Sequence, residues 1–247
     1  MLSTTEQIAG WLAASKRPVA FTGAGISTES GIPDFRSPGG VWATNQPVCY
    51  DEFLRSSEAR YEYWRQKAVA HRGFADAKPN LGHEALAKWE SSGKLRGVIT
   101  QNIDGLHQDA GSQQVLELHG TARFIACLDC AARFDAEEMV QKFIDVDTPP
   151  ECPQCSGLLK HATISFGQSL PTEVLEQAMQ WSRDADLFFA MGSSLVVQPA
   201  AGLPMLAKQS GARLVIINRD PTPQDELADA VIQASIGETL SAIDQCM

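Results

Sequence analysis

Two Cys-x-x-Cys pairs, Cys127/Cys130 and Cys152/Cys155, constrain the fold of this chain more than any other feature. Two sulfur atoms three residues apart can reach one metal ion from a tight turn, and two such turns supply the four thiolates of a structural Zn²⁺ site. The pairs are separated by 21 residues, slightly more than in a usual zinc ribbon. Four buried free cysteines are the alternative, but they leave the repeated spacing unexplained. A four-thiolate site has no open coordination position, so we expect one structural Zn²⁺ ion and look for chemistry elsewhere.

Length, composition and charge narrow the class of protein. The chain has 247 residues, 44% of them hydrophobic, which fits one large domain with insertions. It has no run of about 18 apolar residues and no signal-like N-terminus, so we expect no membrane association. The net charge is −10, and residues 127–155 carry no basic cluster, so we expect no nucleic-acid partner. Cys49 and Cys246 lie far apart in sequence, which favours a reduced, cytoplasmic setting.

Apolar runs alternate with helical patterns along most of the chain. Strands are predicted at residues 17–22, 95–100, 186–191, 213–218 and 230–234, and helices at 83–90, 172–182, 200–209 and 236–246, after a short N-terminal helix. This alternation predicts an α/β fold, a Rossmann-like parallel sheet with helices on both faces. Two stretches break the pattern, a helical insert at 37–82 and the zinc-ribbon insert at 120–161. We expect them to form a small inserted domain, and residues 1–36, 83–119 and 162–247 to form the large one.

Polar motifs stand where the predicted strands end. Gly23-Ala24-Gly25-Ile26-Ser27 follows the first strand, where glycines let a backbone approach a pyrophosphate. This motif is weak alone, because Thr28 replaces the third glycine of the usual fingerprint and a plain tight turn is the alternative. Similar polar segments stand at 30–36, 100–104, 119–120, 192–194 and 218–220. The carboxyl ends of parallel strands share one edge of a sheet, so these segments predict a cleft for a polar, hydroxyl-rich ligand.

Taken together, these motifs resemble those of the sirtuins, which are NAD⁺-dependent protein-lysine deacylases. The matching segments are Gly23 to Ser27, Gly31 to Arg36, Thr100 to Asp104, His119-Gly120, both cysteine pairs, Phe166-Gly167 and Gly192 to Leu195. They occur in the order of the family and span nearly the whole chain. The helical insert is most similar to the class II sirtuins, the group that includes the fourth human, mitochondrial member.

The resemblance implies roles for named residues. His119 matches the general base, as befits an imidazole that titrates near neutral pH, and Asn102 joins it as a catalytic residue. The residues expected to bind NAD are Gly23, Ala24, Gly25, Ile32, Asp34, Phe35, Arg36, Gln101, Asn102, Ile103, Asp104, Gly192, Ser193, Ser194, Asn218, Arg219, Asp220 and Ile236. Within that set, Phe35 and Arg36 match a loop that closes over the nicotinamide. The acyl-lysine peptide is expected to add as a strand between two segments that contain Ile164, Phe166, Gly167, Leu195 and Val196.

The implied reaction consumes NAD⁺. The acyl oxygen of the modified lysine attacks the nicotinamide ribose, nicotinamide leaves, and His119 helps a ribose hydroxyl to take the acyl group. The products are free lysine and O-acyl-ADP-ribose, and the partners are acyl-lysine proteins. One alternative is mono-ADP-ribosyl transfer to protein at the same NAD site. Another is a non-catalytic NAD-binding or zinc-ribbon interaction protein, although intact Asn102, Asp104 and His119 argue against it. The oligomeric state is left open.

The chain departs from the usual sirtuin pattern near the predicted substrate segment. Many sirtuins have proline shortly before this segment, where this chain reads Lys160-His161-Ala162-Thr163, and Gln168 replaces glutamate after Phe-Gly. Sirtuins that remove acidic acyl groups carry a Tyr-x-x-Arg pair in the helical insert, and this chain has Trp64 and Lys67 at those places. Lys67 or Arg65 meeting an acidic acyl tail is an alternative to their packing or facing solvent. The preferred acyl group is therefore left open.

Overall fold

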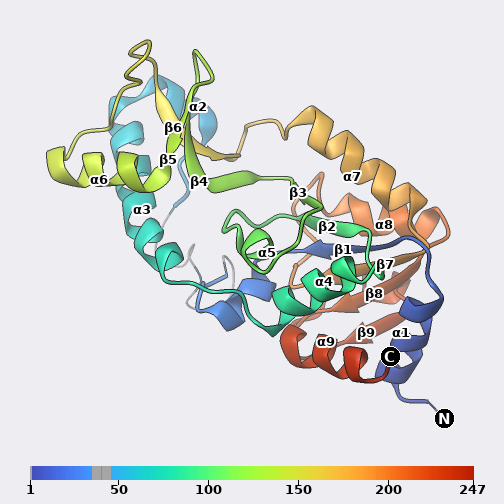
Figure 1. The fold of residues 1–247 in the computed structure, drawn as a ribbon. Helices are drawn as coiled ribbons and strands as arrows, with labels where there is room; N and C mark the ends of the chain where they lie inside the picture. Colours follow the sequence, from blue (N-terminus) through green and yellow to red (C-terminus); the bar gives the residue numbers. More distant parts are fainter. Residues whose placement is uncertain (1, 35–39, 41–45) are drawn as a thin grey trace.

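A six-stranded sheet forms the centre of the computed structural model, which describes residues 2–34, 40 and 46–247 (Figure 1). Its order is β3-β2-β1-β7-β8-β9, and neighbouring strands are parallel. The strands are β1 (Pro18–Thr22), β2 (Gly97–Thr100), β3 (Val115–Glu117), β7 (Leu187–Met191), β8 (Arg213–Ile217) and β9 (Ala230–Ile232). The chain runs outward from β1 to β3 and then resumes on the other side of β1 with β7. The order therefore reverses between β1 and β7, a point at which open α/β sheets bind ligands.

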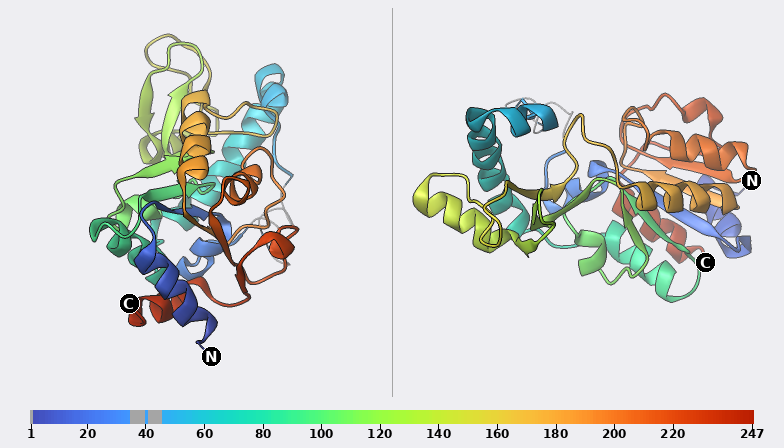
Figure 2. Two further views of the ribbon diagram at one scale, coloured as in Figure 1. Left: turned by 90° about the vertical axis from the view of Figure 1, so that its right-hand side faces the viewer. Right: turned by 90° about the horizontal axis from the view of Figure 1, so that it is seen from above.

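Helices cover both faces of this sheet, as Figures 1 and 2 show. One face packs against α1 (Thr4–Ala14), α4 (Leu81–Ser91) and α9 (Ile236–Gln245), and the other against α7 (Thr172–Asp184) and α8 (Gly202–Gln209). Strand β1 shows how the sequence produces two cores: Ala20 belongs to the first and its neighbours Val19 and Phe21 to the second. A strand buried on both faces has no polar side, which explains its continuous apolar run. The predicted α/β class is confirmed.

Helix α4 begins at Leu81, two residues before the predicted start, because Asn80 caps it. The Asn80 side-chain oxygen accepts the N–H of Gly82 at 2.9 Å. Its amide nitrogen donates to the carbonyl of Ile26 at 2.7 Å. The cap therefore also ties α4 to η1 (Ala24–Ser30), the short 3₁₀ helix that follows β1.

A second, antiparallel sheet carries the cysteine pairs. Its order is β5-β4-β6, from β4 (Gly120–Cys127), β5 (Arg133–Asp135) and β6 (Leu159–Thr163), with α6 (Ala136–Val146) between β5 and β6. Helices α2 (Tyr50–Arg55) and α3 (Ser57–Ala75) from the helical insert pack beside it (Figure 1). Trp64 of α3 is fully buried in this shared core and donates its indole N–H to the Leu159 carbonyl at 3.2 Å. The two inserts thus share one apolar cluster, while the exact domain boundaries stay a prediction.

Two further short helices, α5 (Leu106–Asp109) and η3 (Asp225–Leu227), follow β2 and β8. Among the helices that the structure describes, none is both long and apolar enough to cross a membrane.

Candidate active site and zinc centre

Two glycine loops meet at the switch point between β1 and β7. The N–H of Gly23 donates to the Met191 carbonyl at 3.0 Å, and that of Gly25 to the Gly192 carbonyl at 2.8 Å. A Cβ on Gly25 would lie 2.6 Å from the Cα of Gly192, and one on Gly192 would lie 2.5 Å from the backbone nitrogen of Ile26. Gly192 also has φ +62°, which disfavours any side chain. Only glycine allows this close approach, and such a cradle fits the pyrophosphate of a dinucleotide.

Polar side chains from neighbouring loops line the same edge of the sheet. Gln101, after β2, donates to the hydroxyl of Ser193, after β7, at 2.7 Å, so the two loops are joined across the end of β1. After β8, a guanidinium nitrogen of Arg219 lies 3.0 Å from the carboxylate of Asp220 and 3.7 Å from that of Asp34. The predicted residues of four separate segments therefore lie along one edge.

Ser27 links two of the predicted site residues, Asn102 and Asp104. Its hydroxyl accepts from the Asn102 amide at 3.0 Å and donates to the Asp104 carboxylate at 2.7 Å. The other Asp104 oxygen accepts the N–H of Leu106 at 2.9 Å. Ser27 belongs to the glycine motif, but it is not among the site residues that the sequence predicts. The sequence signal that points to it is a hydroxyl group one turn after a glycine loop of the type that binds phosphates.

His119 is held in the form that a general base requires. Its Nδ1 lies 3.0 Å from the Gln101 carbonyl, and because a carbonyl only accepts, Nδ1 carries the proton and Nε2 keeps its lone pair. Burial lowers the pKa of His119 from its usual value, and the hydrogen bond to Gln101 opposes this more weakly. The imidazole is thus neutral at pH 7. Its backbone carbonyl accepts the N–H of Ile164 at 2.9 Å, which fixes the predicted substrate segment beside it.

The two predicted substrate segments are loops. Phe166 is 44% exposed and Val196 is 50% exposed, whereas Leu195 is buried with φ +53°. The Phe166 carbonyl accepts the N–H of Tyr50 at 2.8 Å, which connects this loop to the helical insert. Each loop exposes an apolar side chain to solvent, as expected for a surface that binds a peptide.

Other predicted residues take varied positions. Ile32 is buried, and Ile236 is buried at the start of α9, where its N–H donates to a Glu29 carboxylate oxygen at 3.1 Å. The Asn218 amide donates to the Asp220 carbonyl at 2.7 Å. Phe35 and Arg36 lie outside the described residues, so their predicted role stays a prediction.

The four cysteines converge as the spacing predicted. All four sulfur atoms lie within 4.8 Å of one another, with 3.5 Å between Cys127 and Cys155 and 3.7 Å between Cys130 and Cys152. A disulfide would require about 2.05 Å. Tetrahedral zinc with Zn–S bonds of about 2.3 Å places its sulfur atoms about 3.8 Å apart. The cluster therefore fits a structural four-thiolate zinc site.

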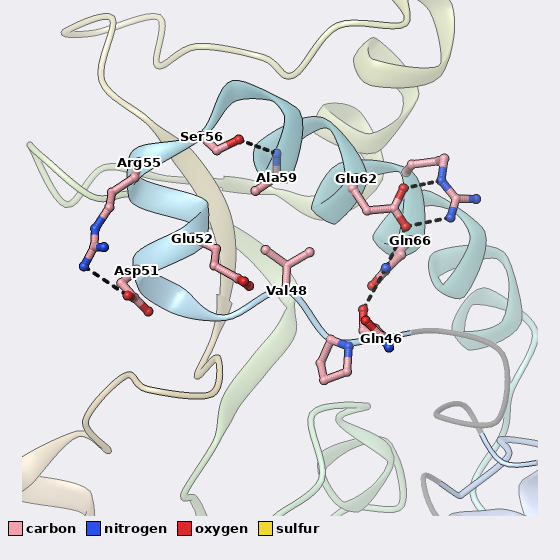
Figure 3. Close-up of a pocket in the computed structure, with 11 residues that line it drawn as sticks. Gln46, Val48, Asp51, Glu52, Arg55, Ser56, Ala59, Glu62 and Gln66 are labelled. Atoms are coloured by element: carbon pink, nitrogen blue, oxygen red, sulfur yellow. Dashed lines mark hydrogen bonds and ion pairs between the residues drawn. The ribbon is translucent and has the colours of Figure 1, made fainter.

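A separate cavity of about 600 Å³ lies between α2, α3 and residues 46–48 (Figure 3). Two of its carboxylates are paired internally: Asp51 lies 3.1 Å from Arg55, and Glu62 lies 2.7 Å from Arg65. Glu52 accepts the N–H of Cys49 at 2.9 Å. The cavity is lined by residues of the helical insert and not by the glycine cradle. The three carboxylates named here already form ion pairs or hydrogen bonds with neighbouring residues of that insert.

Trp64 and Lys67 stand at the two positions where sirtuins that remove acidic acyl groups carry tyrosine and arginine. Trp64 is a core residue, as described above, and presents its N–H to a backbone carbonyl. The Lys67 ammonium lies 5.6 Å from the centre of the Tyr63 ring, and burial lowers the pKa of Lys67 to about 8. Arg65 is paired with Glu62. Trp64 and Arg65 are therefore engaged in packing and local pairing.

Comparison with known proteins agrees with this geometry. Residues 23–199 match the Sir2 family. The chain is 52% identical over 240 residues to the "NAD-dependent protein deacetylase 1" of Bradyrhizobium diazoefficiens, covering 96% of this chain and 94% of that one. It is 50% identical to the "NAD-dependent protein deacetylase" of Rhodopseudomonas palustris, with coverage of 96% and 95%.

Solved structures show the same relationship. A Sir2 complex with a p53 peptide and NAD⁺ superposes with a TM-score of 0.91 at 37% identity, and covers 98% of both chains. A Sir2 variant with deacetylated p53 peptide and 3'-O-acetyl ADP-ribose gives 0.91 at 38% identity with the same coverage. The sequence match, the shared fold and the cradle with its polar edge agree, and the chain belongs to the Sir2 family.

Proposed function

We propose that this chain is an NAD-dependent protein-lysine deacylase that transfers the acyl group to ADP-ribose and releases nicotinamide. The observation that carries the proposal is the state of His119. Its Nδ1–H is fixed on the Gln101 carbonyl, its Nε2 has no hydrogen-bond partner among the described residues, and its backbone carbonyl holds the loop that contains Ile164. The relatives named as deacetylases and the neighbour with bound acetyl ADP-ribose support the same reaction.

The cofactor-binding roles follow the positions of the residues. The cradle of Gly23, Ala24, Gly25 and Gly192 holds the phosphates, and Asn218, Arg219 and Asp220 face the adenosine end. The other residues proposed to bind NAD are Ile32, Asp34, Phe35, Arg36, Gln101, Asn102, Ile103, Asp104, Ser193, Ser194 and Ile236. When bound, NAD⁺ supplies an electrophilic ribose carbon and a nicotinamide leaving group.

Protein side chains position the reactants and move one proton. Ser27 fixes the Asn102 amide and the Asp104 carboxylate side by side, which keeps both groups oriented toward the ribose and carboxamide. His119 takes a proton from a ribose hydroxyl at Nε2, and neutrality at pH 7 makes it competent to do so. A base that must be neutral loses activity in acid, so the rate should rise with pH through a pKa below the usual histidine value.

The acyl-lysine peptide lies between the two exposed loops. Phe166 and Gly167 contact it from one side, with Ile164 behind them, and Leu195 and Val196 contact it from the other. Structural neighbours bound to acetylated and propionylated peptides support this class of partner. We also propose the division into a large domain and two inserts, one structural zinc ion on the four cysteines, and a cytoplasmic location, where thiolates stay reduced.

The proposal can be tested by incubating the protein with NAD⁺ and a panel of peptides and identifying the products by mass spectrometry. Each peptide contains a lysine that carries an acetyl, succinyl, glutaryl, lipoyl or long-chain acyl group. The expected result is loss of an acyl group together with the matching O-acyl-ADP-ribose, and the most rapidly processed peptide identifies the acyl preference. Release of nicotinamide with ADP-ribose attached to protein would instead support mono-ADP-ribosyl transfer. His119→Ala is the control, because it should still bind NAD⁺.

A further inference from the structure

We propose that His107, supported by His83, is a positioning residue that holds Asn102 in place through a chain of buried hydroxyl groups. The inference rests on the proposed function for its kinetic consequence, but its structural core concerns which ring nitrogens carry protons. Both histidines are buried, His107 at 1% exposure and His83 at 0%.

A continuous set of hydrogen bonds leads from His107 to Asn102. The Nε2 of His107 lies 2.9 Å from the hydroxyl oxygen of Thr22, at the end of β1. Thr22 donates to the hydroxyl oxygen of Thr100, at the end of β2, at 2.8 Å. Thr100 also accepts the backbone N–H of Asn102 at 3.0 Å. Asn102 is thus held by Thr100 at its backbone and by Ser27 at its side chain.

The direction of these bonds fixes the tautomer of His107. Thr22 has one hydroxyl proton and gives it to Thr100, so its oxygen can only accept from the imidazole. His107 must therefore carry a proton on Nε2, and in the neutral ring its Nδ1 is an acceptor. That Nδ1 is buried and has no hydrogen-bond partner among the described residues.

His83 supplies the complementary group. Its Nδ1 accepts the backbone N–H of Asn80 at 3.3 Å, so a neutral His83 carries its proton on Nε2. Within the described part of the chain, this Nε2 likewise has no partner. The two rings are in edge contact, with centroids 4.8 Å apart and planes at 60°. The two rings in contact therefore carry one buried donor and one buried acceptor, neither of which has a partner among the described residues.

Neutrality of both rings agrees with their surroundings. Burial lowers the pKa of His107 to about 3, and the neighbouring His83 adds to the effect. Burial also lowers the pKa of His83, against the opposing charges of Asp104 and Glu29. The opposite tautomer of His107 would leave the Thr22 oxygen, whose proton goes to Thr100, facing a lone pair.

The role of His107 in catalysis can be tested by two substitutions, one of which serves as a matched control. His107→Leu removes the N–H that fixes Thr22, whereas His107→Gln places an amide N–H near the Nε2 position. With acetyl-peptide and NAD⁺, we expect kcat to fall about tenfold in the leucine variant with the peptide KM unchanged, which is the loss expected for one buried hydrogen bond. The glutamine variant should stay within about twofold of the wild type. Full kcat in the leucine variant, or an equal loss in both, would overturn the proposal.

The tautomers can be measured in the unmodified protein, so the proposal stays falsifiable if a variant fails to fold. Two-bond ¹⁵N–¹H correlation spectra of histidine-labelled protein should show His83 and His107 as neutral Nε2–H rings between pH 6 and 8, and His119 as an Nδ1–H ring. An Nδ1–H or charged His107 would overturn the inference even if deacylation is observed. Absence of deacylation in the wild type, with the tautomers as expected, would instead count against the proposed function.

Discussion

The burial of the His107 imidazole predicts how the free energy of unfolding changes at acid pH. Its pKa falls to about 3 in the folded protein because burial disfavours the charged ring, whereas an unfolded chain restores about 6.5. Below pH 6.5 the unfolded state therefore binds a proton that the folded state does not. The free energy of unfolding must decrease as pH falls from about 6.5 toward 3, by up to about 1.4 kcal/mol per pH unit.

Between pH 7 and pH 5.5 this linkage amounts to about 1.3 kcal/mol, taking the two pKa values above. The assay is urea unfolding of the wild type and of His107→Gln at both pH values. The neutral glutamine does not titrate, so the variant should lose about 1.3 kcal/mol less stability than the wild type over this interval. Other acid-sensitive groups, including the zinc thiolates, are common to both proteins and cancel in the comparison. Equal losses in the two proteins would refute the assigned burial of a neutral His107.

Three further substitutions test other parts of the site. His119→Ala should retain NAD⁺ binding by calorimetry while kcat falls by about 10²- to 10⁴-fold, the usual range for loss of a general base. Cys127→Ala should lose the bound zinc by elemental analysis and lower the melting temperature, because the metal closes the small sheet. Gly192→Ala should cost at least about 1 kcal/mol of stability and weaken NAD⁺ binding, since φ +62° disfavours a side chain and its Cβ would meet Ile26.

Each of these has a result that contradicts it. Unchanged turnover of His119→Ala would remove that residue as the base. A metal-free Cys127→Ala protein with wild-type stability and activity would refute the structural zinc. Gly192→Ala with normal NAD⁺ affinity would mean that the close approach of the two loops does not serve the dinucleotide. Gly10→Ala is a matched control, because nothing lies within 4 Å of an added Cβ there.

The sequence predicted the central sheet well because its strands are buried on both faces. The runs at 17–22, 186–191 and 213–218 correspond to β1, β7 and β8 within one residue at each end. Strand β2 begins later than predicted, at Gly97. The cysteine spacing likewise predicted the convergence of four sulfur atoms, since a Cys-x-x-Cys turn is a local feature. These signals arise within short stretches of chain and need no knowledge of tertiary packing.

The remaining features depend on contacts between distant residues. Ser27 and Asn102 lie 75 positions apart, and nothing in either local sequence reveals their hydrogen bond. Helix α6 and the burial of Trp64 follow from the joint packing of two inserts. The left-handed backbone at Leu195, with φ of +53°, is likewise not apparent from its apolar sequence. The candidate site residues were therefore predicted from motifs, whereas the residues that hydrogen-bond to them in the structure were not.

The most direct test of the central claim is the stoichiometry of a single reaction. Purified protein, an acetyl-lysine peptide and NAD⁺ would be followed by quantitative mass spectrometry for deacetylated peptide, nicotinamide and O-acetyl-ADP-ribose. The proposed chemistry predicts that the three products appear in equal amounts, with none formed when NAD⁺ is left out. Free acetate released without NAD⁺, or nicotinamide formed while the peptide stays acetylated and ADP-ribose appears on protein, would contradict it.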